Sequence, residues 1–502
     1  MNRYLKKTML ALCSLVAVAL LAWSCGSKEG TRVGSVADVR KATIGVQLGT
    51  TNDVQASLLE EKGYGAHVER FTKSADAVQA LCQGKIDCMI EDEYPARAFL
   101  RRNPSLRILP QVFSTSDIAV CVAKDNEPLL QDIDRAIAQM RKDGTLDTIV
   151  ARHVEGRATV AYTPQNEGKP LPGRRTLRYA LNAAFEPFEY YEDGRIVGID
   201  VDVAHAICDR LGMNFELVDM EFDAIITSVQ AGKADAGISA ITMTEERSKN
   251  ISFSKPYATM KQVVIVRSDE ATAQSHGLVE KFRTCFVTGH RYQYLLQGLG
   301  NTLVITLFAM VLSLVLGTLI AIVRATHDRN GNFRLLNLLC QVYLTVIRGT
   351  PSMVQLLIIY YVVFASADVN KIVVAITAFG LNSAAYIAEV IRSGIMSVSH
   401  GQMEAGRSLG LSYSQTMRLV VLPQAFRNVL PAIGNELITL LKETSISGYI
   451  GLVDLTKGSD IIRSVTYDAM MPLGMVAAIY LLIVLALSAG VSQLEKRLNR
   501  KA

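Results

Sequence analysis

The stretch Leu303–Val323, which reads LVITLFAMVLSLVLGTLIAIV, contains no charged residue. As an α-helix it would rise about 30 Å, the thickness of one bilayer core. Met471–Val491 is likewise uncharged, and further apolar runs cover Ile372–Ile395, about 352–367 and, less clearly, Ala432–Ile450. The C-terminal part of the chain therefore predicts an all-α transmembrane domain of about five helices.

The composition indicates that a soluble part accompanies this membrane part. The chain has 502 residues, 50% of them hydrophobic but 20% charged, with 52 Lys+Arg against 47 Asp+Glu and a net charge of +5. Such apolar content excludes a disordered protein, and the small positive surplus gives no reason to expect nucleic acid as a partner. The eight cysteines form no CxxC pattern, which disfavours a zinc site and dithiol redox chemistry. We expect no metal site and no cofactor on this chain.

The first 25 residues have the pattern of a secretory signal. Arg3, Lys6 and Lys7 precede an apolar run from Met9 to Trp23 that is too short to span a membrane comfortably. The small residues before Cys25 resemble a bacterial lipoprotein signal, which implies lipidation of Cys25. An uncleaved signal anchor is the alternative. In either case the residues that follow are exported.

Basic residues orient the predicted spans. With five spans, three basic clusters fall on one side of the membrane, and the positive-inside rule makes that side cytoplasmic. The C-terminus is then cytoplasmic, and the region before the first span lies outside. The clusters are Arg324, Arg329 and Arg334; Arg407, Arg418 and Arg427; and Lys496, Arg497, Arg500 and Lys501.

The most specific motif lies between the third and fourth predicted spans. Residues 401–423 contain Glu404-Ala405-Gly406, then Gly410, then Leu422-Pro423. This resembles the EAA loop of ABC importer permeases, with Gly406 in place of the second alanine. We expect a short helix, a turn at Gly410, and a second helix stopped by Pro423. The resemblance implies that this loop docks on an ATPase and transmits its closure to the membrane helices.

Several other segments extend the resemblance over about residues 282–498. They include Arg348-Gly349-Thr350-Pro351 and Leu441-Lys442-Glu443-Thr444-Ser445. Together they resemble permeases of the polar amino acid group, the importers of histidine, glutamine and arginine. Such permeases work as pairs, either as a homodimer or with a related chain. The sequence has no Walker A pattern, so ATP and Mg²⁺ are expected on a separate ABC ATPase.

The exported residues 176–267 alternate strand-like and helical patterns, and they resemble the first half of a periplasmic amino-acid-binding protein. That resemblance implies that Phe185 and Phe222 sandwich the ligand side chain. It also implies that Thr242 and Arg247 bind the α-carboxylate and that the backbone at Ala240 binds the ammonium. A guanidinium suits a carboxylate because it can donate two parallel hydrogen bonds. The alternative for Arg247 is a solvated helix end.

Residues 43–153 resemble the second half of the same family. The segment Gln47-Leu48-Gly49-Thr50-Thr51 resembles its strand-to-helix turn, which implies ligand contacts at Gln47 and a backbone N–H of Thr51 that receives the carboxylate. Asp92 corresponds to the acid that pairs with the α-ammonium, and its alternative is an exposed loop acid. Asn182 favours an amide or polar neutral ligand, whereas an inward Glu91 would favour a cationic one.

The two halves occur in reversed order. We interpret this as a circular permutation with new ends at the hinge, in which Glu155–Arg175 joins the usual C-terminus to the usual N-terminus. In the rival interpretation the halves are exchanged within a homodimer, or each serves a partner protein. The predicted fold class is an exported α/β two-lobe periplasmic-binding-protein fold of type II, with reversed halves, followed by the permease. The predicted domains are a signal (1–25), a linker (26–41), the second half (42–155), a linker (156–175), the first half (176–268), a pre-membrane segment (269–297) and the permease (298–495).

These observations predict the binding and translocating subunit of an ATP-driven importer of polar amino acids in the bacterial inner membrane. A ligand-gated channel or receptor is the alternative. The sequence contains no TVGYG-like filter, and only about ten residues follow the last predicted span. An enzyme is disfavoured because we find no nucleophile–base or metal constellation in the sequence.

Overall fold

The computed structural model describes residues 31–155, 170–268, 277–365 and 369–499. The predicted signal with Cys25 lies outside the described residues, as does most of the predicted 156–175 linker. The described chain divides into two compact units. The first takes its residues from Met1–Glu91, Asn103–Ser114 and Gln262–Thr272, and the second from Asp92–Arg102, Thr115–Lys261 and Ala273–Ala502.

A five-stranded sheet in the order β2-β1-β3-β13-β4 forms the centre of the first unit. The interior strand β1 pairs in parallel with both β2 and β3. Ile44 and Val46 of β1 are fully buried, as expected for an interior strand of a sheet that packs against helices. The elements are η1 (Val36–Lys41), β1 (Thr43–Gln47), α2 (Thr51–Glu61), β2 (His67–Phe71), α3 (Ser74–Cys82), β3 (Cys88–Asp92), β4 (Leu106–Ile118) and β13 (Ala258–Arg267). Strands β4 and β13 also contribute residues to the second unit.

The α/β part of the second unit has its own five-stranded sheet, in the order β10-β6-β11-β5-β12. Strand β5 precedes residues 156–169 in the chain, whereas its neighbours β11 and β12 follow them, and both pair antiparallel with β5. Strands β7, β8 and β9, which follow β6 in the chain, form a separate small sheet in the order β7-β8-β9. The strands are β5 (Cys121–Ala123), β6 (Thr176–Leu181), β7 (Ala184–Phe185), β8 (Glu189–Glu192), β9 (Arg195–Val197), β10 (Asn214–Asp219), β11 (Ala236–Gly237) and β12 (Ile251–Phe253).

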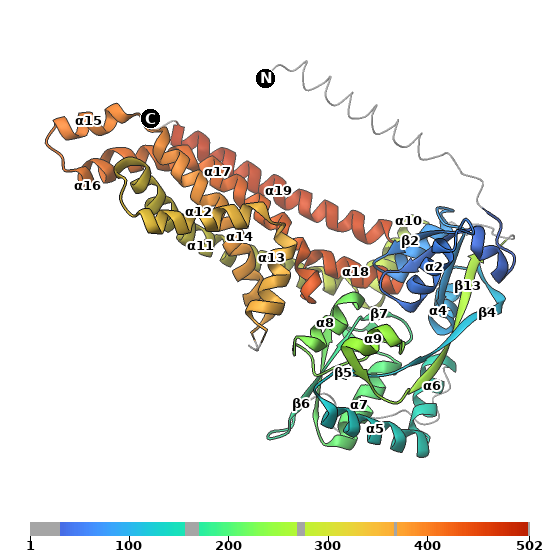
Figure 1. Ribbon diagram of the computed structural model, residues 1–502. Helices are drawn as coiled ribbons and strands as arrows, with labels where there is room; N and C mark the ends of the chain where they lie inside the picture. The colour runs from blue at the N-terminus through green and yellow to red at the C-terminus, as the bar shows by residue number, and fades with distance from the viewer. Residues whose placement is uncertain (1–30, 156–169, 269–276, 366–368, 500–502) are drawn as a thin grey trace. The chain divides into compact units, whose positions relative to one another are not determined.

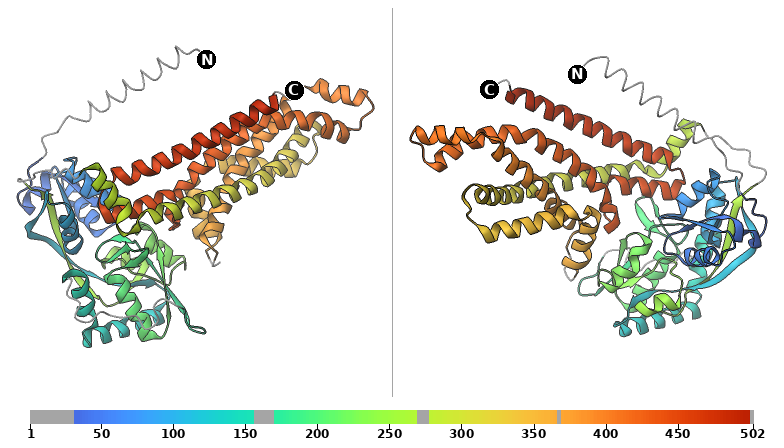
Figure 2. Two further views of the ribbon diagram at one scale, coloured as in Figure 1. Left: turned by 180° about the vertical axis from the view of Figure 1, so that it is seen from behind. Right: turned by 45° about the horizontal axis from the view of Figure 1, so that its top comes forward.

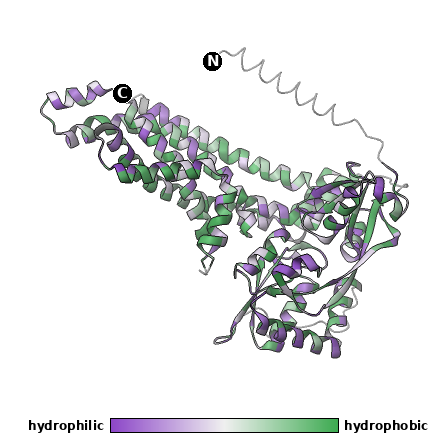
Figure 3. Cartoon of the chain, in the orientation of Figure 1, coloured by the Kyte–Doolittle hydropathy of each residue, from purple (hydrophilic) through white to green (hydrophobic). Residues whose placement is uncertain are grey.

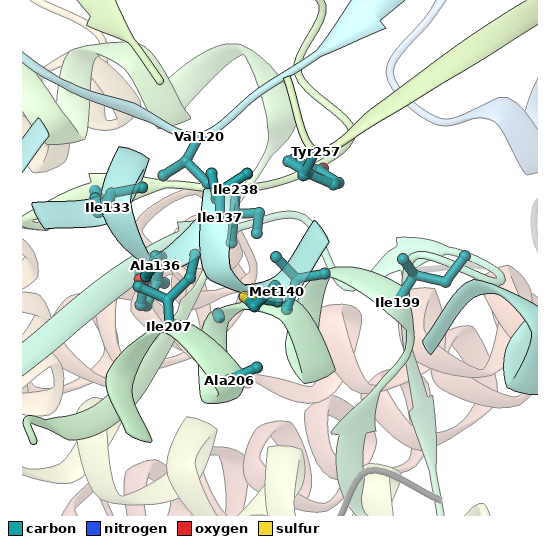
Figure 4. Close-up of a cluster of buried hydrophobic side chains, with 14 of the residues drawn as sticks. Val120, Ile133, Ala136, Ile137, Met140, Ile199, Ala206, Ile207, Ile238 and Tyr257 are labelled. Atoms are coloured by element: carbon teal, nitrogen blue, oxygen red, sulfur yellow. The ribbon is translucent and has the colours of Figure 1, made fainter. Parts of the chain in front are cut away.

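Helices complete this α/β part and cover its apolar core. In α5, Leu129, Ile133, Ile137 and Met140 recur at helical spacing, so one face of the helix is apolar and buried. That face packs against Ile207 of α7 and other buried side chains, as Figure 4 shows. The helices are α4 (Glu93–Arg102), α5 (Glu127–Lys142), α6 (Thr145–Glu155), α7 (Ile199–Leu211), η2 (Phe222–Ala224), α8 (Ile225–Gln230) and α9 (Glu245–Asn250).

The rest of the second unit is helical and strongly apolar (Figure 3). Helices α11, α14, α17 and α19 pack side by side along much of their length (Figures 1 and 2). Glycines allow α11 and α14 to approach closely: a Cβ on Gly317 would lie 2.8 Å from Ile387, and one on Gly380 would lie 2.6 Å from Leu312. The main helices are α10 (Leu278–Phe282), α11 (Tyr292–Asn330), α12 (Arg334–Gly349), α13 (Ser352–Ile358), α14 (Lys371–Ser397), α15 (His400–Ser408), α16 (Tyr413–Thr416), α17 (Leu422–Glu443), α18 (Leu455–Thr466) and α19 (Met470–Asn499).

The predicted spans agree with the structure to different degrees. Within the described residues, three helices are long and apolar enough to cross a membrane, and they contain the predicted spans 303–323, 372–395 and 471–491. The predicted span 352–367 is instead the second part of a pair, Arg334–Gly349 and Ser352–Val363, bent by 111°. The prediction for 432–450 has the wrong bounds, because α17 begins at Leu422 and ends at Glu443. The count of five spans stays a prediction.

Candidate ligand-binding and coupling sites

Arg247, Thr242 and Phe222 lie together in the second unit. Arg247 is in α9, where Thr244 caps the helix by accepting a hydrogen bond from the Arg247 N–H at 3.2 Å. Its guanidinium Nη1 donates to the carbonyl oxygen of Thr242 at 2.9 Å, and its Cζ lies 5.6 Å from the centre of the Phe222 ring. Burial lowers the pKa of the Arg247 guanidinium below its usual value. The side chain is therefore held over an aromatic ring, and the alternative of a solvated helix end is wrong.

Ala240 has a left-handed backbone conformation, with φ +43°. Such a conformation costs about 1–2 kcal/mol for an alanine, so it persists only where neighbours hold it. Its N–H donates to Oδ2 of Asp200 at 2.6 Å, and the hydroxyl of Tyr257 donates to Oδ1 of the same carboxylate at 2.8 Å. Asp200 and Tyr257 thus orient the backbone that the sequence assigns to the ligand ammonium.

Asp200 was not singled out from the sequence, although it is fully buried near the start of α7. Burial raises its pKa to about 6, even though the hydrogen bonds from Ala240 and Tyr257 act in the opposite direction. A second buried acid, Glu189, accepts a short hydrogen bond from Ser239, next to Ala240 in the chain. Burial, followed by the charge of Asp200, raises the pKa of Glu189 well above its usual value. The signal available in the sequence was an acid between two apolar residues, Ile199 and Val201, at the start of a helix.

Asn182 and Phe185 follow strand β6 in the same unit. Asn182 is buried, and its Nδ2 donates to the carbonyl oxygen of Met220 at 2.7 Å. Phe185 stacks on Phe188, with ring centres 5.9 Å apart. The side chain of Asn182 therefore joins the end of β6 to the segment that carries Phe222.

The first unit contains Gln47 and Thr51. The side chain of Gln47 holds the neighbouring loop: its Nε2 donates to the carbonyl oxygen of Thr72 at 3.2 Å, and its Oε1 accepts from the Ser74 hydroxyl at 3.1 Å. Thr51 is the first residue of α2, and its hydroxyl accepts from Nε2 of Gln262 at 3.1 Å. N–H groups in the first turn of a helix have no partner within that helix, which is why such ends bind anions.

Glu91 and Asp92 end strand β3, and both are buried, with 3% and 6% of their surface exposed. The alternative that Asp92 is an exposed loop acid is therefore wrong. Burial of two successive carboxylates is costly unless each has polar partners. The role of Asp92 at the ligand ammonium stays a prediction.

The segment that resembles a coupling loop consists of α15, a turn and α16. Gly410 has φ +83°, which glycine adopts without strain, so the predicted turn is confirmed. A Cβ on Gly406 would lie 2.4 Å from Cγ2 of Thr416, so the absent methyl group lets α15 and α16 pack closely. Glu404 and Ala405 are exposed on α15.

The prediction that Pro423 stops a helix is wrong. The chain stays helical from α16 through a π-helical stretch, Met417–Val421, and into α17, where Pro423 is in the first turn. The π-helical stretch directly before Pro423 changes the hydrogen-bond pattern at this point, and Pro423 lies in the first turn of the α-helical part, where its missing N–H is tolerated. Pro423 therefore lies within a continuous helical path, at the start of its long α-helical part.

Comparisons with known proteins place this geometry in context. Residues 177–469 match the family model of bacterial extracellular solute-binding proteins, family 3, and this range is more than half of the chain. The chain is 36% identical over 208 residues to the arginine transport system permease protein ArtQ of Bacillus subtilis, covering 41% of this chain and 93% of that protein. It is also 37% identical over 190 residues to the probable amino-acid ABC transporter permease protein YckA of B. subtilis, covering 38% and 82%.

The chain belongs to the family 3 solute-binding proteins and to the amino-acid ABC transporter permeases. A further permease relative is the putative glutamine transport system permease protein GlnP of Rickettsia prowazekii, 34% identical over 207 residues, 41% of this chain and 93% of that protein.

Among solved structures, a crystal structure of an amino acid ABC transporter with histidines is 40% identical, with a TM-score of 0.39, and covers 42% of this chain and 98% of its own. Domain 1 of TmArgBP in its arginine-bound form is 41% identical, with a TM-score of 0.17, over 19% of this chain and 82% of its own. On the family match and the permease relatives, the chain combines a two-lobe binding fold with a helical permease region.

Proposed function

We propose that this chain captures a polar amino acid outside the cell and passes it through a paired permease driven by a separate ABC ATPase. The observation that carries the proposal is the cluster of Arg247, Thr242 and Phe222, in which Thr242 is buried and the other two are half-buried, in a chain that also contains an amino-acid permease. Its relatives act in arginine and glutamine transport systems, and no observation favours the alternative of a receptor or channel.

The proposed ligand is a zwitterion recognised at both ends. Its carboxylate binds the Arg247 guanidinium, the Thr242 hydroxyl and the backbone N–H of Thr51, whereas its ammonium binds the Ala240 carbonyl oxygen and Asp92. A fixed guanidinium fork gives a carboxylate two parallel hydrogen bonds, which a lysine cannot supply. Phe185 and Phe222 enclose the aliphatic stem, and Asn182 contributes to side-chain selectivity. Ligand contacts from both lobes would favour a closed state.

The reversed order of the halves is proposed to be a circular permutation of a type II binding fold. The support is the sheet of the second unit, in which β5 pairs with β11 and β12 across residues 156–169. Strands from both predicted halves therefore share one sheet within one chain. This favours a single permuted domain over halves that are exchanged between two chains.

The permease is proposed to bind its ATPase through residues 401–423, with Glu404, Ala405, Gly406, Gly410 and Pro423 in the coupling segment. Two apolar side chains support a docking surface there, because Leu409 and Leu419 are 82% and 63% exposed. We place this loop and the C-terminus on the cytoplasmic side and the binding domain outside, from the distribution of basic residues. Signal cleavage, lipidation of Cys25 and pairing with a second permease copy belong to the same proposal.

Calorimetry on the full chain in lipid nanodiscs tests the proposal. Titration with L-arginine, L-glutamine and L-histidine should show one bound amino acid per chain for at least one of them. The same compound as its carboxamide, which lacks the carboxylate, and as its N-acetyl derivative, which lacks the ammonium, should not bind. Equal binding of either derivative would contradict two-ended recognition, and no binding of any polar amino acid would contradict the proposal.

A further inference from the structure

A buried lysine of the permease region lies against two acids of the binding lobe, all within the second unit. Lys457 is in α18, and its Nζ lies 3.0 Å from Oε1 of Glu221 and 3.7 Å from Oδ2 of Asp219. The side chains are 5%, 9% and 9% exposed, respectively. Burial alone would lower the pKa of Lys457, but the two carboxylates outweigh burial and raise it above its usual value. An ammonium this deeply buried depends on its partners, because losing one strands a charge in a poorly solvated site.

The two acids flank the segment that carries a candidate ligand residue. Asp219 ends β10, Glu221 comes two residues later, and Phe222 follows directly. Oδ1 of Asp219 accepts from the Ala183 N–H at 2.9 Å, and the Met220 carbonyl oxygen accepts from Nδ2 of Asn182 at 2.7 Å. The partners of Lys457 are therefore tied to both Asn182 and Phe222, which the proposed ligand contacts.

Lys457 belongs to helix α18, which packs directly on α11, the helix that contains the predicted span 303–323. Asp454 caps α18 by accepting from the N–H groups of Thr456 and Lys457 at 2.7 and 2.9 Å. A Cβ on Gly458 would lie 2.5 Å from the carbonyl oxygen of Tyr294, so α18 touches the backbone of α11. A Cβ on Gly451, before α18, would lie 1.7 Å from the carbonyl oxygen of Asp219, so the lobe and this segment also meet backbone to backbone.

We propose that Lys457 is a positioning residue that links ligand occupancy near Asn182 and Phe222 to movement of α18, and through α18 to α11. This inference rests on the proposed function. A ligand that packs on Phe222 displaces the segment containing Asp219 and Glu221. Because Lys457 cannot stay buried without these carboxylates, α18 follows the segment rather than separating from it. Lys457 itself does not touch the ligand.

Hydrogen–deuterium exchange on the full chain in nanodiscs tests this link, with binding measured by calorimetry on the same preparations. A saturating mixture of L-arginine, L-glutamine and L-histidine should change exchange in α18 and in the first turns of α11 in the wild type. In Lys457→Met, the affinity should stay within about threefold of wild type, whereas the exchange response of α18 should fall about tenfold. Lys457→Arg keeps a buried cation and should keep most of the response.

Two further variants make the result specific. Lys233→Met is the matched control, because Lys233 also joins the lobe to the permease region, by a hydrogen bond to the Phe364 carbonyl oxygen, but it follows α8 rather than lying in the segment that carries Phe222. Its exchange response in α18 should be unchanged. Glu221→Gln removes one partner of Lys457 without removing the lysine, so it should also reduce the exchange response of α18. It replaces Lys457→Met as the test if that variant does not fold.

The outcomes separate the two proposals. If the wild type binds none of the three amino acids, the proposed function fails and this inference fails with it. If it binds but α18 does not respond, or if the response in both Lys457→Met and Glu221→Gln is as large as in the wild type, only the inference is overturned. It is also overturned if Lys457→Met loses affinity as severely as a substitution of Arg247, since Lys457 would then support the binding site itself.

Discussion

The two units hold the predicted ligand residues in different ways. In the second unit, side chains hold one another and the backbone: Arg247 lies over Phe222, and Asp200 and Tyr257 fix Ala240. In the first unit, the polar side chain of Gln47 is occupied in holding a loop, and the group of Thr51 that is proposed to bind the ligand is a backbone N–H at a helix start. Side-chain substitutions should therefore affect binding strongly in the second unit and weakly at Thr51.

The largest effect is expected for Arg247→Gln. The variant keeps a polar side chain, which is shorter and lacks the charge and the paired donors, so amino-acid affinity should fall by about 3 kcal/mol, roughly 100-fold. Calorimetry on the full chain measures it. Lys249→Gln in the same helix α9 is the matched control, because Lys249 is exposed. Wild-type affinity in Arg247→Gln would show that the second unit does not bind the ligand through the Arg247 side chain.

An intermediate effect is expected at Asp200, and it concerns stability against pH. Burial raises the pKa of Asp200 to about 6, above its ordinary value of 3.8. Between these values the folded protein holds a proton that the unfolded chain has lost, so stability is full below the lower value and falls as pH rises through about 6. Glu189, whose pKa is also raised, acts in the same direction.

Asp200→Asn cannot titrate, and the pH dependence should weaken accordingly. Over pH 4–7 we expect the unfolding free energy of the wild type to decrease by roughly 1–3 kcal/mol, and that of the variant to decrease less. Denaturant unfolding followed by near-ultraviolet circular dichroism of the tyrosines measures this. Asp147→Asn, at an exposed carboxylate of α6, should leave the slope as in the wild type. A steeper slope in Asp200→Asn would show that another group governs it.

The sequence predicted what depends on short stretches of chain. An uncharged run of bilayer length has few alternatives to a membrane helix, and 303–323 and 471–491 lie within such helices. The motif around Thr242 and Arg247 predicted a cluster that the structure brings together. Features between distant residues were not predictable: Tyr257 reaches Asp200 across 57 positions, and Lys457 reaches Glu221 across 236. The left-handed backbone at Ala240 depends on such a tertiary neighbour, Asp200, and not on local propensity.

The smallest effect is expected for Thr51→Val. Valine has nearly the same shape and retains the backbone N–H, which is the group proposed to receive the carboxylate, so affinity should change by less than about threefold. The hydroxyl is occupied by Gln262, and its loss removes one acceptor within the first unit rather than a ligand contact. Calorimetry beside Arg247→Gln gives the ratio of the two effects. A loss at Thr51→Val that approaches the loss at Arg247→Gln would mean that the first unit also recognises the ligand through a side chain, because valine leaves the helix start and its N–H in place.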